Sequence, residues 1–175
     1  MYKAFKSNIT PFGGISLIHN QLLSKDIVNF IDNQLGKRVK TVGYDYSELI
    51  LSRIYTSFCG GNATEDVNYI RENTLCHLKG ICIPSADTIL RGDNELSVES
   101  YFLDNDSGKE HLVNVNPKMN RFLLASAIKF EQVNPSSKDL VLDFDHQFIA
   151  ASKYDAAYSY KKQKGYFSGI ATINN

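Results

Sequence analysis

The chain has 175 residues, of which 43% are hydrophobic and 22% are charged. Its 19 basic and 19 acidic residues cancel, which excludes a histone-like protein that holds nucleic acid by bulk charge. The apolar fraction excludes intrinsic disorder. The apolar runs are far shorter than the roughly 20 residues that cross a bilayer, and the N-terminus lacks a signal-peptide pattern. We therefore expect a cytoplasmic protein without a membrane partner.

Apolar residues recur at helical spacing over about the first 130 residues. The first two helices are expected over 15–23 and 27–35. Ser24 is the expected N-cap of the second helix, and Gly36 stands where a C′ glycine belongs.

Residues typical of N-caps mark four further helix starts. Asp45, with Glu48 three residues later, forms a capping-box pattern, and this helix should end at Gly60. The other expected starts are Thr64, Ser85 and Asn116, the last followed by a proline at the first helical position. A polar loop is expected over 104–111.

Beyond Pro135 the hydrophobic period changes from helical spacing to alternation. Residues 140–145 form an expected strand, with 140, 142 and 144 on one face and 141, 143 and 145 on the other. A second extended segment is expected over 169–173. The sequence thus predicts an α+β protein, with a helical domain over 1–134 and the first strands of an incomplete sheet over 135–175.

Two aspartates on one face of the expected strand are the clearest chemical feature. Asp143 and Asp145 are two residues apart and are expected at the C-terminal end of that strand. Carboxylates so placed can hold Mg²⁺, which proteins bind through one or two carboxylates together with substrate phosphates. The alternative, that a strand end displays solvated aspartates, stays open from the residues alone.

Basic residues gather in two short stretches. Lysines alternate with tyrosines over 154–166, where Lys161, Lys162 and Lys164 can neutralise phosphates and Tyr160 can stack on a base or hydrogen-bond to the backbone. The second stretch consists of Lys37, Arg38 and Lys40. Either stretch is also compatible with an ordinary solvated turn.

Other catalytic patterns find little support in the sequence. Cys76, His77 and Cys82 offer three metal ligands, but no fourth ligand stands at a zinc-site spacing. The chain has no G-x-S-x-G, P-loop or G-x-G-x-x-G pattern, so hydrolase, NTPase and Rossmann functions are not indicated.

Several segments in chain order resemble the N-terminal part of bacterial DDE-type insertion-sequence transposases. These segments are 9–14 (ITPFGG), 38–44 (RVKTVGY), 58–61 (FCGG) with 65–66, 84–92 (PSADTILRG), 143–145 (DFD) with 153–156 (KYDA), 160–166 (YKKQKGY) and 169–173 (GIATI). The resemblance implies a helical N-terminal domain followed by an RNase H-like catalytic domain, here represented by its first strands. It also implies a DNA-transposition enzyme that binds the terminal inverted repeats of its element.

The resemblance further implies three acidic residues that bind Mg²⁺ or Mn²⁺ for strand cleavage and transfer. Asp145 matches the first of them best, with Asp143 as the alternative, because His146 and Gln147 depart from the family's usual Ser or Thr. The family's second Asp and its Glu follow downstream of residue 175. We therefore expect this chain, whether a fragment or a decayed gene product, to be inactive in cleavage alone and to hold no metal firmly.

Two functions of different class remain as hypotheses. The chain is the N-terminal part of a Mg²⁺-dependent transposase, or it is a non-catalytic module that binds DNA or dimerises and can inhibit the intact enzyme. The expected partners are double-stranded DNA and a second copy of the chain, at the bacterial nucleoid within the cytoplasm.

Overall fold

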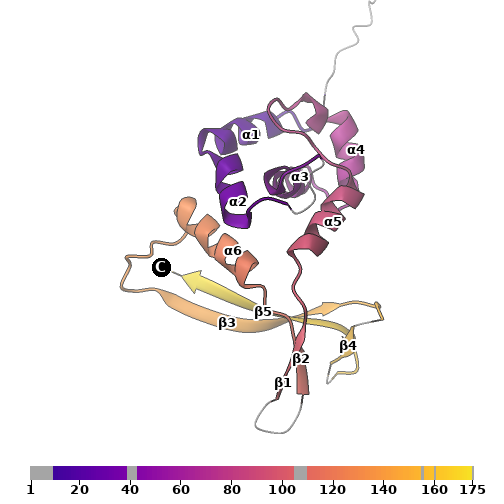
Figure 1. The fold of residues 1–175 in the computed structure, drawn as a ribbon, viewed down its shortest axis with the longest axis vertical. Coiled ribbons are helices and arrows are strands. Elements are labelled where there is room, and N and C mark those ends of the chain that lie inside the picture. The colour runs from indigo at the N-terminus through magenta and orange to yellow at the C-terminus, as the bar shows by residue number, and fades with distance from the viewer. Residues whose placement is uncertain (1–9, 39–42, 105–109, 155, 160, 175) are drawn as a thin grey trace, which may run out of the picture. The chain divides into compact units, whose positions relative to one another are not determined.

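The computed structural model describes residues 10–38, 43–104, 110–154, 156–159 and 161–174. This part of the chain contains both helices and antiparallel sheets, which confirms the α+β class (Figure 1). Contacts divide the chain into two compact units, Met1–Phe122 and Leu123–Asn175, and each is described by itself. The division falls within helix α6 (Pro117–Lys129), whereas the expected domain boundary is residue 134.

The first unit, which we call the helical unit, is built around one central helix. Figure 1 shows α3 end-on, with other helices of this unit around it, and α3 contacts α2, α4 and α5. The helices are α1 (Ile15–Ser24), α2 (Ile27–Leu35), α3 (Tyr46–Phe58), α4 (Asp66–Asn73) and α5 (Ala86–Leu96), with a 3₁₀ turn over Leu75–His77.

Apolar stripes from these helices meet in a closed core. Each of the larger core side chains is at most 1% exposed and contributes about 1.5–3 kcal/mol on burial. They are Ile31, Leu35, Leu51, Tyr55, Val67, Leu75 and Ile89. Helices α3 and α5 approach closely at Gly92, where an added Cβ would lie 2.3 Å from the Cδ1 atom of Leu49.

The predicted helix ends are confirmed at several positions. The Asp45 backbone N–H donates to the Glu48 carboxylate at 3.0 Å, which completes the capping box at the start of α3. The Met119 N–H donates to the Asn116 side chain at 3.0 Å at the start of α6. Gly36 ends α2 with a positive φ of 74°, a conformation that favours glycine.

Two predicted helix starts were wrong by a few residues. Ser24 is the last residue of α1, and its hydroxyl donates to the Gln21 carbonyl at 2.8 Å instead of capping α2. The link to α2 is Asp26, which has φ 54° and accepts a hydrogen bond from the Asn29 amide. Helix α4 begins at Asp66 instead of Thr64, because Thr64 and Glu65 form a turn before the helix.

A short hairpin flanks most of the polar loop that was predicted over 104–111, and residues 105–109 of that loop lie outside the described residues. Strands β1 (Tyr101–Asp104) and β2 (Glu110–Val113) pair in antiparallel register, with Tyr101 opposite Val113. The strands follow two short runs of aromatic and aliphatic residues that flank the polar segment, and such runs favour strands. The loop prediction was wrong at 104, 110 and 111, which belong to the strands, and the two strands were not predicted because each run has only four residues.

The second unit, which we call the ribbon unit, contains a three-stranded antiparallel sheet in the order β3-β5-β4. Its strands are β3 (Val141–Ala150), β4 (Ala157–Tyr158) and β5 (Lys164–Asn174). Both predicted strands are confirmed and are longer than expected. The alternation is confirmed as well, since Asp143 lies opposite Thr172 while Phe144 lies opposite Ala171 on the other face.

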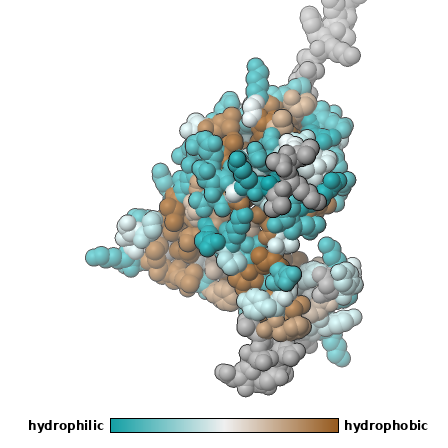
Figure 2. All heavy atoms as spheres, in the orientation of Figure 1, coloured by the Kyte–Doolittle hydropathy of each residue, from teal (hydrophilic) through white to brown (hydrophobic). Residues whose placement is uncertain are grey.

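One face of the β3–β5 ribbon is apolar and exposed. Leu142, Phe144 and Phe167 are 69%, 59% and 48% exposed, and apolar side chains are visible at the surface in Figure 2. The ring of Phe144 covers Gly169, where an added Cβ would lie 2.8 Å from the Phe144 Cζ atom. The absence of a Cβ at Gly169 therefore lets this ring approach the neighbouring strand closely.

The helices of the described part of the chain do not have the length and apolar character that a membrane span requires. The longest of them, α3 and α6, have 13 residues each.

Candidate functional site

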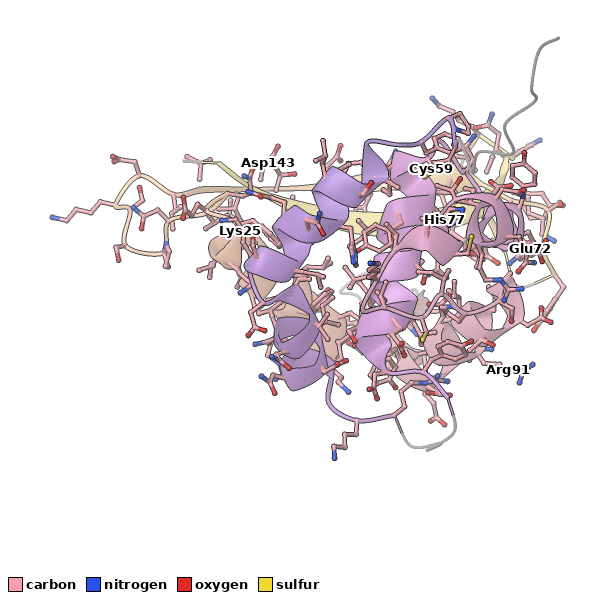
Figure 3. All side chains as sticks on the ribbon, turned by 90° about the horizontal axis from the view of Figure 1, so that it is seen from above. Lys25, Cys59, Glu72, His77, Arg91 and Asp143 are labelled. Atoms are coloured by element: carbon pink, nitrogen blue, oxygen red, sulfur yellow. The ribbon has the colours of Figure 1, made fainter. Side chains whose placement is uncertain are left out.

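The two aspartates lie side by side on the polar face of the ribbon. Asp143 and Asp145 are both exposed and belong to β3, with Thr172 and Ile170 opposite them on β5. Their Cα atoms are roughly 7 Å apart, as expected for alternate residues of a strand. Asp145 accepts a hydrogen bond of 2.7 Å from the backbone N–H of His146. Figure 3 labels Asp143 on the strand.

A shallow concavity of about 530 Å³ covers this part of the ribbon. Both aspartates face it, and so do side chains from the opposite strand. It is lined by Asp143, Asp145, His146, Gln147, Phe148, Ile170 and Thr172. The aspartates therefore border an open surface with room for a hydrated ion or a phosphate group.

The aspartates lie in the first half of β3, whereas they were expected at the C-terminal end of the strand. The strand continues for five residues beyond Asp145, to Ala150. Phe148 and Ile149 extend it because they pair with Phe167 and Tyr166 on β5. Both carboxylates therefore lie on the surface of the ribbon, away from the end of the strand.

The carboxylate pair meets part of what Mg²⁺ requires. Its oxygen atoms are hard ligands, and Mg²⁺ is commonly held by one or two carboxylates while it keeps several waters. No group of three His, Cys, Asp or Glu side chains in the described ranges surrounds a common point. Asp143 and Asp145 thus supply a partial site that fits one hydrated ion and leaves positions for other ligands.

A second cluster lies where β4 pairs with the start of β5, and we call it the basic tip. It consists of Lys153, Tyr154, Tyr158, Lys161, Lys162 and Lys164. Tyr158 lies opposite Lys164 across the strands. The turn between them is closed by two backbone hydrogen bonds, from Ser159 to Gln163 at 2.8 Å and from Lys162 to Ser159 at 2.9 Å.

The basic tip carries a local excess of positive charge in a neutral protein. Residues 151–164 contain four lysines and one aspartate, which gives a net charge of +3. The described lysines of the tip are exposed apart from the half-buried Lys164. A compact group of this kind can contact successive phosphates of a nucleic acid. The predicted contact Tyr160 lies outside the described residues.

The second predicted basic stretch has a different structural role. The Arg38 guanidinium donates to both carboxylate oxygens of Glu95, at 2.8 and 2.7 Å, and to the Tyr44 carbonyl at 2.9 Å. Its side chain is only 7% exposed. Hydrogen bonding to Glu95 raises the pKa of Arg38. Arg38 therefore fastens the segment before α3 to α5, and we leave it out of the DNA-contacting set.

The remaining members of this stretch are Lys37, which is exposed, and Lys40, which lies outside the described residues. The cysteines stay thiols: Cys59 is buried, which raises the pKa of its thiol, while Cys76 and Cys82 are exposed. Cys76 donates to the Glu72 carbonyl at 3.2 Å. Figure 3 labels Cys59, Glu72 and His77 on the helical unit.

Sequence reasoning did not single out every residue that the structure brings to these sites. Tyr154 and Tyr158, which are 97% and 73% exposed, were not among the chosen contacts. Their spacing among lysines was the available signal. Thr172 and Ile170 line the concavity through the register of β5, and the sequence carried no signal for that register.

Comparisons with models of protein families, with curated proteins and with solved structures found no match to this chain.

Proposed function

We propose that this chain is the N-terminal part of a DDE-type DNA transposase, in which the ribbon begins an RNase H-like sheet and Asp145 is the first metal ligand. The observation that carries the proposal is the pair Asp143 and Asp145, exposed on one polar face of a long antiparallel ribbon. The segments that resemble the family support it. The proposal covers double-stranded DNA as partner and action at the bacterial nucleoid.

In this proposal metal binding and DNA binding belong to two different parts of the ribbon unit. Asp145, with Asp143 as its neighbour or alternative, would hold a Mg²⁺ or Mn²⁺ ion together with ligands from outside this chain. Such an ion would act as a Lewis acid that stabilises negative charge in a phosphoryl transfer. Lys161, Lys162 and Lys164 at the basic tip bind phosphates and so position the DNA. Lys37 is kept as a further contact from the helical unit.

DNA binding is tested by fluorescence anisotropy with a labelled random-sequence duplex of about 30 base pairs, from about 50 to 200 mM KCl. Each phosphate contact contributes about −0.9 to the slope of log affinity against log salt, so three lysines should contribute about −2.7. The triple variant Lys161→Gln, Lys162→Gln, Lys164→Gln should lose that part of the slope.

The matched control removes the same charge elsewhere, by Lys25→Gln, Lys79→Gln and Lys138→Gln, all exposed in the structure. It should keep the slope of the unchanged chain. A slope near zero for the unchanged chain would contradict DNA binding, and an equal loss in both variants would show bulk charge instead of a tip contact.

The metal site is tested with Mn²⁺, whose unpaired electrons broaden nearby NMR signals. We expect millimolar Mn²⁺ to broaden the amide signals of 143–147 and 169–172 first. Asp145→Asn should abolish this selective broadening, and Asp143→Asn should weaken it. Asp139→Asn, an exposed aspartate just before β3, is the control. Uniform broadening at all exposed carboxylates would reject the assignment.

A second candidate is a DNA-binding module that acts without catalysis. The basic tip favours it, because its lysines can bind phosphates without a metal ion. Duplex affinity that is unchanged by EDTA, together with no selective Mn²⁺ broadening at the aspartates, would favour this candidate. The proposed homodimer is measured by sedimentation of the same samples.

A further inference from the structure

We propose that the basic tip takes single-stranded DNA, with Tyr154 and Tyr158 as stacking platforms for unpaired bases. This inference rests on the proposed function, because it adds an unpaired segment of the DNA to the duplex that the proposed function assigns as partner.

Tyr154 and Tyr158 are exposed to solvent, whereas the tyrosines of the helical core are buried. Tyr154 is 97% exposed and Tyr158 is 73% exposed, whereas Tyr46 and Tyr55 are 3% and 0% exposed. An aromatic ring left in water loses the stabilisation that burial of its faces would give. The tip therefore offers two open ring surfaces that a flat partner can cover.

The backbone brings these rings and the lysine charges into one small region. The Ala156 N–H donates to the Lys153 carbonyl at 3.2 Å, so the chain turns between Tyr154 and Tyr158. The Ala151 N–H donates to the Lys164 carbonyl at 3.0 Å, which joins the end of β3 to the start of β5. Both rings thus lie on a short, hydrogen-bonded support.

This combination of chemistry distinguishes unpaired from paired nucleic acid. Lysines attract phosphates in either form, but the faces of bases in a duplex are already stacked on their neighbours. An unpaired base has free faces, and stacking it on an aromatic side chain strengthens binding with little sequence preference. Two exposed tyrosines among four lysines match the requirements of a single strand better than those of a duplex.

The test measures the affinity of the chain for three labelled nucleic acids. They are an oligo-dT of about 15 nucleotides, a DNA duplex of the same length and an oligo-U of the same length. Tyr154→Ser and Tyr158→Ser should each weaken oligo-dT binding about fivefold, the lower range of base–aromatic stacking. Duplex affinity should change less than about twofold, since lysine–phosphate contacts remain. Tyr69→Ser is the matched control, because Tyr69 is 71% exposed on α4. Circular dichroism melting verifies that every variant is folded.

Selective loss of oligo-dT affinity in both tip variants would support the inference. Binding of the duplex alone, or oligo-dT binding that ignores both tyrosines, would overturn it while leaving the proposed function intact. Tighter binding of oligo-U than of oligo-dT would overturn the assignment to DNA. Binding of neither form would reject this inference and the proposed function together.

Discussion

The helical unit and the ribbon unit bury their apolar residues to very different extents. Seven large side chains of the helical unit are at most 1% exposed. In the ribbon unit the buried apolar side chains among the described residues are Val133 and Ala156, each 8% exposed, while Leu142 on β3 is 69% exposed. Helices wrapped around α3 close a core of their own, whereas a narrow ribbon has two faces and little to cover them.

The helical unit has a buried core that accounts for its stability, whereas the ribbon unit carries the exposed residues of the candidate sites. Two-stranded and narrow sheets are marginally stable in water, and three or more strands with a covered face are usually needed. The aspartate pair and the basic tip both lie on the ribbon unit. We therefore expect changes in the helical unit to alter stability and changes on the polar face of the ribbon to alter binding.

The largest effect should come from one matched pair of leucine truncations. Leu51→Ala in the centre of α3, where the side chain is 0% exposed, should lower the free energy of unfolding by about 3 kcal/mol, because it leaves a cavity. Leu142→Ala on the ribbon should change it by less than about 0.5 kcal/mol. Urea unfolding followed by circular dichroism measures both, and equal losses would break the comparison.

The next effect concerns two ion pairs of the helical unit that differ in burial. Glu95→Gln leaves the Arg38 guanidinium, whose side chain is 7% exposed, without its charged partner. The expected loss is about 3 kcal/mol. The Arg53–Asp93 pair is about 40% exposed on both sides, so Asp93→Asn should cost at most about 1 kcal/mol. Thermal melting of both variants at matched ionic strength gives the comparison.

The smallest effect is a pH dependence that originates in the helical core. The Tyr55 hydroxyl and the Nδ1 atom of His19 are 2.7 Å apart, and His19 Nε2 lies 2.8 Å from the Lys79 carbonyl. A carbonyl can only accept, so Nε2 carries the proton and Nδ1 accepts from Tyr55. Burial raises the pKa of Tyr55 to about 12, against about 10 in an unfolded chain.

Between pH 10 and 12 the folded chain therefore retains a proton that the unfolded chain has lost. Stability from this group is complete below pH 10 and is lost as the pH rises through about 12. Urea unfolding at pH 9 and 11.5 should show a loss of about 1–2 kcal/mol. Tyr55→Phe should remove this dependence, and Tyr158→Phe at the exposed tip should not. A dependence that survives Tyr55→Phe would assign it to other groups.

Local patterns in the sequence were sufficient to predict the elements that depend on near neighbours. The capping box of Asp45 and Glu48, the C′ glycine Gly36 and the alternation around Asp143 and Asp145 each involve residues a few positions apart. The faces of the ribbon were therefore predictable. The length of β3 was not, because the residues beyond Asp145 become a strand by pairing with β5.

Contacts between distant residues explain what the sequence could not predict. Arg38 stood in a run of basic residues that indicated a DNA contact, but its partner Glu95 lies 57 positions away. Tyr154 lies in the segment between β3 and β4 and Tyr158 ends β4, so their exposure depends on how these strands pair with β5. Neither charge spacing nor hydrophobic period records such pairings, so composition alone could not separate the structural Arg38 from the exposed lysines of the basic tip.

The position of β3 at the edge of the sheet suggests a second role for the two aspartates. In the order β3-β5-β4, strand β3 is the outer strand, and one side of its backbone has no neighbour among the described strands. Outer strands with bare backbone groups recruit other chains, and charged side chains discourage this. Asp143 and Asp145 therefore also act as gatekeepers against edge-to-edge aggregation. The negative charge that would attract a metal ion also helps to keep separate molecules apart in concentrated solution.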